Sequence, residues 1–247
     1  MAKIDAYRQQ LAAVQEWDAF LLEESGLPGP RGNLELAKAV AWEIDSARCW
    51  RYAGISAEEA PPGTAEEFLS FCGVLGLGKL CLQGDTKALP ALRQSASDPR
   101  WRTREAVAMA LQFIGTHDVY KMVTIAKEWA HGTHLEQRAA IAGICRPALL
   151  KEPHAAQAAS DILNTVTTSL SQAGDRKAKA CKVLRQSLAY CWSVAVAASP
   201  EIGKPLMETW MASTHHDIRW MLKQNLKKKR LLRMDPDWVQ AQTAVFE

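Results

Sequence analysis

One pattern, an arginine followed by apolar residues at helical spacing, recurs in this 247-residue sequence and constrains its fold more than any other feature. In three segments an arginine is followed, at steps of three and four residues, by apolar residues, a spacing that gathers side chains on one face of a helix. The segments are Arg104–Val107–Leu111, Arg138–Ile141–Cys145 and Arg219–Leu222–Leu226. The first two arginines are 34 residues apart and the last two are 81 apart, so a further unit of about 40 residues fits between them. Such a period predicts stacked helix pairs.

An Asp-Pro step separates the two helices of the first unit. The stretch LPALRQSASDPRWRTREAVAMAL indicates a helix, a break at Asp98-Pro99 and a second helix that carries Arg104. An aspartate at the turn with an arginine six residues later resembles the HEAT repeat, in which this pair bridges adjacent repeats. The resemblance extends over residues 84–234 and is partial in the later units, where Gly132 and Ser213 take the place of the aspartate. It implies an all-α fold, a right-handed α-solenoid of stacked antiparallel helix pairs. It does not imply a defined activity, because HEAT repeats share a shape rather than a function.

The N-terminal part has three apolar helical segments between breaks rich in proline and glycine. We expect helices over residues 3–24, 34–50 and 66–82. The third segment contains three glycines, Gly73, Gly76 and Gly78. No strand precedes them and no GK[ST] follows, so they predict a close helix crossing rather than a phosphate-binding loop.

One continuous repeat domain of 247 residues is expected, because each layer of such a fold needs only its neighbours. We divide it into N-terminal helices and a cap (1–83), repeats (84–234) and a C-terminal tail (235–247). The N-terminus lacks an apolar signal region, and the longest uncharged run, Gln186–Pro200, is too short to cross a bilayer. The sequence therefore predicts a cytoplasmic protein without a membrane partner.

Catalytic and metal-binding motifs are missing from the sequence. The six cysteines lie in apolar segments that are expected to be helical, and no two of them form a CxxC pair. This predicts buried thiols in a reducing compartment. Two histidine pairs, His131 with His134 and His215 with His216, are expected at polar turns. We therefore expect no catalytic residue, no metal site and no cofactor.

Nine tryptophans, several beside arginines, provide the candidate contact residues. An indole at a helix start either stacks on a ligand or packs between layers. On the surface lined by the second helix of each pair, the candidates are Trp101, Arg104, Arg138 and Trp220. The leading hypothesis is a non-enzymatic scaffold that holds a protein or peptide on its concave face.

Aromatic and basic residues on helical repeats also resemble the DNA-alkylation-repair glycosylases, in which Trp, Asp and Arg on a concave face hold a damaged nucleotide. Trp101, Asp98, Arg104 and Arg138 are of the right residue types. The resemblance implies an alternative in which the chain binds nucleic acid and excises a base. In the HEAT interpretation, Asp98 and Arg104 instead pair with each other or with adjacent repeats.

Charge is unevenly distributed along the chain. Residues 1–75 contain twelve acids and six bases, whereas Arg219 to Arg233 contain seven bases and no acid. Four of these bases share helical spacing and form a predicted basic stripe: Arg219, Lys223, Lys227 and Arg230. The stripe fits contact with a nucleic-acid backbone, or a solvated helix end where the dipole favours cations. A homo-oligomer joined through the opposite charges of its two ends is a further alternative.

Overall fold

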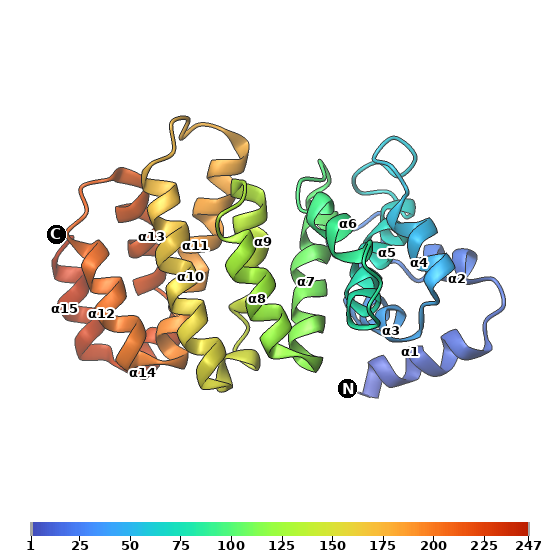
Figure 1. The fold of residues 1–247 in the computed structure, drawn as a ribbon, viewed down its shortest axis with the longest axis horizontal. Helices are drawn as coiled ribbons and strands as arrows, with labels where there is room; N and C mark the ends of the chain where they lie inside the picture. Colours follow the sequence, from blue (N-terminus) through green and yellow to red (C-terminus); the bar gives the residue numbers. More distant parts are fainter. Residues whose placement is uncertain (1, 247) are drawn as a thin grey trace. The chain divides into compact units, whose positions relative to one another are not determined.

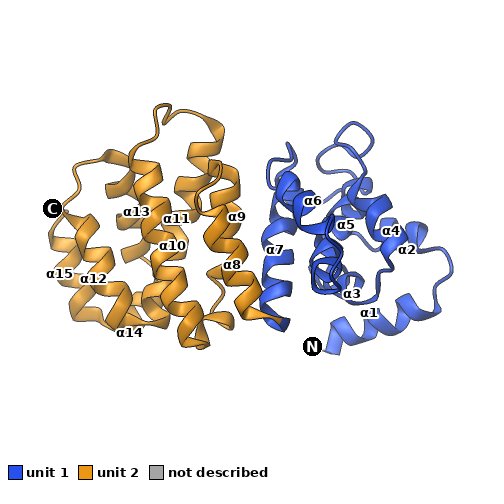
Figure 2. Ribbon diagram, in the orientation of Figure 1, with its two compact units in different colours: residues 1–117 blue, residues 118–247 orange. Residues whose placement is uncertain are grey.

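The computed structural model describes residues 2–246, and this part of the chain contains helices and no strand (Figure 1). The all-α fold class expected for an α-solenoid is confirmed. The helices form two compact units, residues 1–117 and residues 118–247 (Figure 2). The single continuous domain expected from the sequence stays a prediction.

Unit 1 is organised around one long helix. Its helices are α1 (Ala2–Ala13), α2 (Trp17–Glu23), α3 (Leu34–Glu43), α4 (Ser46–Ala53), α5 (Glu66–Leu82), α6 (Ala88–Ser95) and α7 (Trp101–His117). Helices α3, α5 and α7 form a row, while α2, α4 and α6 also pack on α5, and α1 packs on α3. Helix α5, which begins and ends where the sequence predicted, is therefore the core of the unit.

Glycines allow the neighbouring helices to approach α5 closely. A Cβ added at Gly73 would lie 2.2 Å from the backbone nitrogen of Ala53 at the end of α4. On α7, the carbonyl oxygen of Ala110 would lie 2.9 Å from a Cβ at Gly78. Real Cβ atoms do not reach such distances, so only glycine permits both helix crossings. The predicted close helix approach is confirmed.

Two of the helices expected in the N-terminal part are each divided. The segment 3–24 breaks between α1 and α2, where the Trp17 indole donates to the carbonyl of Leu11 over 3.1 Å. The segment 34–50 breaks at Asp45, whose carboxylate accepts the backbone N–H of Arg48 over 2.8 Å and begins α4. The expectation of single helices was wrong, because Asp45 caps a new helix at the second break, while at the first break α2 begins at Trp17 without a side-chain cap.

Unit 2 consists of stacked helix pairs followed by two short helices. Its elements are α8 (Val119–Trp129), α9 (His134–Ile144), the 3₁₀ turn η1 (Leu149–Lys151), α10 (Pro153–Ser171), α11 (Lys179–Ala198), α12 (Pro200–Met211), α13 (His216–Leu226), α14 (Lys229–Met234) and α15 (Pro236–Ala244). Helices α8, α10 and α12 form one layer, and α9, α11 and α13 form the other. The segment 235–247, expected to be a tail, contains α15.

A buried amide joins two helices of the second layer. Asn225 on α13 is fully buried, and its Nδ2 donates to the carbonyl of Leu188 on α11 over 2.9 Å. Its Oδ1 accepts the backbone N–H of Ser193 over 2.8 Å. Because a buried polar group is costly unless it is hydrogen-bonded, these contacts fix how α13 sits on α11.

We expect Gly73→Ala to lower the free energy of unfolding by about 2 kcal/mol, because the new methyl group would push α4 away from α5. The loss would appear although alanine is the better helix former. Urea denaturation followed by tryptophan fluorescence measures it. Gly174→Ala is the matched control, since nothing lies within 4 Å of the Cβ that would be added there. Equal stability of the two variants would contradict the close crossing.

Candidate functional site

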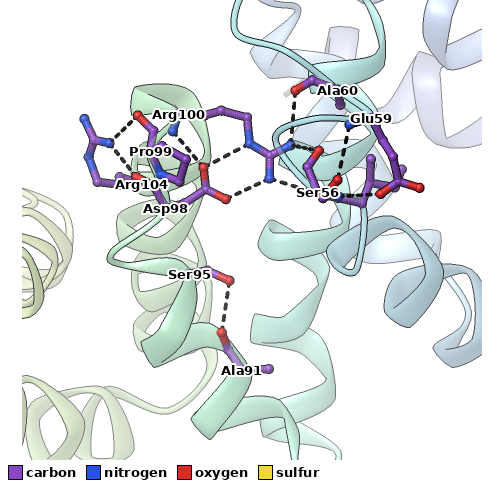
Figure 3. A network of polar contacts seen from close by, with 10 residues as sticks. Ser56, Glu59, Ala60, Ala91, Ser95, Asp98, Pro99, Arg100 and Arg104 are labelled. Atoms are coloured by element: carbon purple, nitrogen blue, oxygen red, sulfur yellow. Dashed lines mark hydrogen bonds and ion pairs between the residues drawn. The ribbon is translucent and has the colours of Figure 1, made fainter.

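The turn between α6 and α7 is organised by Asp98 and Arg100 (Figure 3). The Asp98 Oδ1 atom accepts from the backbone nitrogen and from Nε of Arg100, over 2.7 and 2.9 Å. The Oδ2 atom accepts from Nη2 of the same arginine over 2.7 Å. Arg100 is only 3% exposed, so this ion pair is largely shielded from water.

The same guanidinium holds the loop that follows α4. It donates to the carbonyl oxygens of Ile55, Ser56 and Ala60 over 3.0, 3.1 and 3.3 Å (Figure 3). Arg100 therefore ties this loop to the α6–α7 turn. Sequence reasoning missed this residue, because its loop partners lie 40 to 45 positions earlier in the chain and only the Asp-Pro-Arg turn marks it.

Arg104 supports the turn through backbone contacts. Its Nη1 atom donates to the carbonyl oxygens of Asp98 and Pro99 over 2.6 and 2.9 Å, and the residue is 8% exposed. Arg104 thus contacts Asp98 as expected for a structural pair, but through the main chain. The carboxylate of Asp98 forms its ion pair with Arg100.

A pocket of about 580 Å³ lies beside this turn, within unit 1. Its wall includes Trp50 on α4, Ile55 in the following loop, Gln94 on α6, and the Asp98–Arg100 ion pair. An adjacent hollow shares Trp50 and Gln94 with it. The indole nitrogen of Trp50 donates to Asp85 over 3.1 Å, which fixes this aromatic wall.

Trp101 begins α7 directly after the turn, and its side chain is 53% exposed. The Arg102 guanidinium lies over the indole, 4.5 Å from its centroid. That arginine is anchored by the buried carboxylate of Glu67, 3.2 Å away, and by the carbonyl of Gly29 at 3.0 Å. The exposed indole is therefore held in place by a residue fixed to the core.

Unit 2 contains a similar arrangement around Trp220. Asp217, in the first turn of α13, is 1% exposed and accepts from Arg176 and Arg185 over 2.6 Å each. The hydrogen bond from Arg176, with a further contribution from Arg185, holds the pKa of Asp217 well below its usual value. The Arg185 guanidinium lies 4.6 Å from the centroid of the Trp220 ring. A buried carboxylate thus positions the arginine that contacts this indole.

The four predicted contact residues are divided between the units. Trp101 and Arg104 lie in unit 1, whereas Arg138 on α9 and Trp220 on α13 lie in unit 2. Helix α11 packs between α9 and α13, so the last two residues come from helices on either side of it. Both side chains are half-buried.

The predicted basic stripe is divided between two helices, because α13 ends before Lys227 and α14 begins at Lys229. Arg219 and Lys223 on α13 face the ring of Phe246, at 4.8 and 5.4 Å from its centroid. Arg230 on α14 instead donates to the hydroxyl of Tyr190 over 2.6 Å. The expectation of one continuous basic helix face was wrong.

The cysteines lie in the core as free thiols. Burial raises the pKa of Cys49 to about 12, which keeps this thiol protonated and unreactive at neutral pH. Over residues 2–246, histidine, cysteine and acidic side chains nowhere gather in a group of three that could hold a metal ion.

Replacing Arg100 with methionine should lower the free energy of unfolding by about 3 kcal/mol, because it leaves a shielded carboxylate and three loop carbonyls without their donor. Thermal and urea unfolding would measure the loss. Arg31→Met removes an arginine whose side chain is 70% exposed and should change stability by less than about 0.5 kcal/mol. If both variants were equally stable, Arg100 would not be the link between loop and turn.

The Asp217 ion pairs should make stability depend on pH in a defined direction. A carboxyl whose pKa is lowered by folding stabilises the fold above its ordinary pKa, and this contribution is lost as pH falls through the folded value. Asp217→Asn should therefore cost about 2 kcal/mol at pH 7, and the difference from the wild type should shrink below about pH 4. Asp237→Asn, at an exposed position, serves as the control. A difference that stays constant on acidification would refute the linkage.

None of the helices in residues 2–246 has both the length and the apolar character needed to span a membrane.

The family model for HEAT repeats matches residues 73–142, a segment that extends from α5 to α9 and includes the Asp98 turn. No curated protein and no solved structure matches the chain significantly. The resemblance to DNA-alkylation-repair proteins stays untested. HEAT repeats commonly serve as scaffolds or protein-interaction modules. The comparisons therefore identify HEAT repeats in the segment 73–142.

Proposed function

We propose that the protein is a non-enzymatic scaffold that binds a protein or peptide, and that Trp101 is a principal contact residue. The observation that carries the proposal is the exposed indole fixed by Arg102, which is itself anchored to the buried Glu67. A large aromatic group already fixed in place loses little conformational entropy on binding, and such residues dominate interface energies.

The pocket of unit 1 supports the same proposal. Its Asp98–Arg100 pair is internally neutralised, and the remaining wall combines the Trp50 indole with the uncharged amide of Gln94. A preformed wall of this composition suits an uncharged peptide segment with an apolar side chain. Because the pocket ends at the turn that leads into Trp101, one peptide could contact both features.

The polar contacts of the turn favour a scaffold over an enzyme. The carboxylate of Asp98 is held by Arg100, and the guanidinium of Arg104 is directed to turn carbonyls. Both residues, which the glycosylase alternative would assign to a damaged nucleotide, have structural partners. We therefore propose structural roles for both and a contact role for Trp101.

Selection of peptides from a random display library on the immobilised protein tests the proposal. We expect enriched peptides, and we expect Trp101→Ala to weaken their binding by about tenfold, as is typical for an interface hot spot. Tyr120→Ala is the matched control, because Tyr120 is 66% exposed but lies in unit 2. A further variant, Ala91→Trp, places a bulky side chain in the pocket wall and should also weaken binding if the peptide enters it.

The proposal would fail if no peptide were enriched on the wild-type protein. Equal binding by the wild type and by Trp101→Ala would also refute it. Loss of binding in Tyr120→Ala alone would assign recognition to unit 2 instead. Circular dichroism of each variant separates a lost contact from a lost fold.

A further inference from the structure

A second hollow, of about 360 Å³, lies among α13, α14 and α15 of unit 2. The residues that line it are Lys223, Leu226, Lys227, Leu232, Val239, Thr243 and Phe246. It shares no residue with the pocket of unit 1, and the HEAT-repeat match does not reach it. The function proposed above does not use it.

The floor of this hollow is apolar, and part of that surface is uncovered. Leu226 and Val239 are each 4% exposed and form its base, together with the half-buried ring of Phe246. Leu232, by contrast, is 44% exposed. Covering an exposed leucine with another apolar group is favourable, because it removes apolar surface from water.

The rim of the hollow is positively charged. Lys223 and Lys227 are both exposed, and no acidic residue lines the hollow. Arg219 adds a third cation, because its guanidinium lies over the Phe246 ring. Residues 218–234 contain seven bases and no acid, so the segment that supplies Lys223 and Lys227 has no carboxylate of its own to neutralise them.

We propose that this hollow binds an acidic peptide segment that inserts one apolar side chain between Leu226 and Leu232. The carboxylates of the segment contact Lys223 and Lys227. This occupant matches both features of the hollow, the apolar floor and the cationic rim, whereas a nucleic-acid backbone would use the lysines and leave the floor uncovered.

The openness of the hollow favours a side chain over a lipid chain. Four of its seven lining residues are exposed to solvent: Lys223, Lys227, Leu232 and Thr243. A long acyl chain requires an enclosed apolar channel, since any part left in water loses the favourable burial. A single peptide side chain requires only a short apolar recess with charged groups beside it.

Fluorescence anisotropy with the full chain tests the proposal. The probe is a fluorescein-labelled ten-residue peptide with a central phenylalanine among aspartates and glutamates. Because the pocket of unit 1 is proposed to take uncharged peptides, the altered peptides are compared on the Trp101→Ala variant. There we expect saturable binding that weakens about tenfold when the phenylalanine is replaced by serine, and by a similar factor when the acids are replaced by their amides. Dependence on both replacements distinguishes the two-part site from simple charge attraction.

Variants of the protein provide the second arm. The double variant Lys223→Gln and Lys227→Gln should weaken binding of the acidic peptide about tenfold, and so should Leu232→Ser. The matched control is Lys182→Gln with Lys229→Gln, which removes two exposed cations that do not line the hollow. This control should retain the wild-type affinity within about twofold. If Leu232→Ser fails to fold, the lysine pairs and the altered peptides still decide the question.

Several outcomes would overturn the proposal. Equal losses in the two lysine pairs would indicate non-specific attraction, and unchanged binding of the serine peptide would show that the apolar floor is not used. Tighter binding of a duplex DNA of similar charge would assign the surface to nucleic acid. Binding to phosphatidylserine vesicles without binding to the peptide would assign it to a lipid surface. Trp101→Ala should leave the peptide affinity unchanged, so this test is independent of the one for unit 1.

Discussion

The close packing of α5 against α4 and α7 is the constraint on which unit 1 depends. Gly73 and Gly78 bring both neighbours to distances that any side chain would prevent. Helix α4 leads into the loop that begins at Gly54, and α7 begins directly after Arg100. The crossings at α5 therefore set the distance between loop and turn that the Arg100 guanidinium spans. The wall of the unit 1 pocket follows from that link.

Arginine has the same structural task in both units. In unit 1 the buried Glu67 anchors Arg102, which lies over Trp101, and in unit 2 the buried Asp217 anchors Arg185, which lies over Trp220. A carboxylate in the core thus determines where an indole sits near the surface. The planar guanidinium suits this role, because it bonds the carboxylate at its edge and stacks on the ring with its face.

The sequence predicted the features that depend on local pattern. These features are helix α5, its glycine crossings and the buried cysteines. They could be predicted because the spacing of apolar residues, the helix-breaking residues and the size of each side chain can be read from a short stretch of sequence. The link from Arg100 to Ile55 could not be predicted, since it joins residues 45 positions apart. For the same reason, the sequence suggested Arg104 as a contact residue, although its guanidinium supports the turn.

The division of the basic stripe shows how packing can override helix propensity. Residues 219–233 contain neither proline nor glycine, so local pattern alone favours one helix. Leu226 and Leu231 are both buried, and α13 and α14 both pack on α11. On one continuous helix, two residues five positions apart would point about 140° away from each other. The break after Leu226 allows both leucines to face the core, and it separates Arg230 from the other three bases.

Native-state hydrogen exchange tests the central role of α5 most directly. If the glycine crossings hold unit 1 together, the amides of Val74 to Leu80 should exchange more slowly than those of any other helix in the unit. They should do so only through global unfolding, with a free energy equal to that from urea denaturation. Exchange of these amides through local opening, at the rates of the shorter helix α6, would contradict the account.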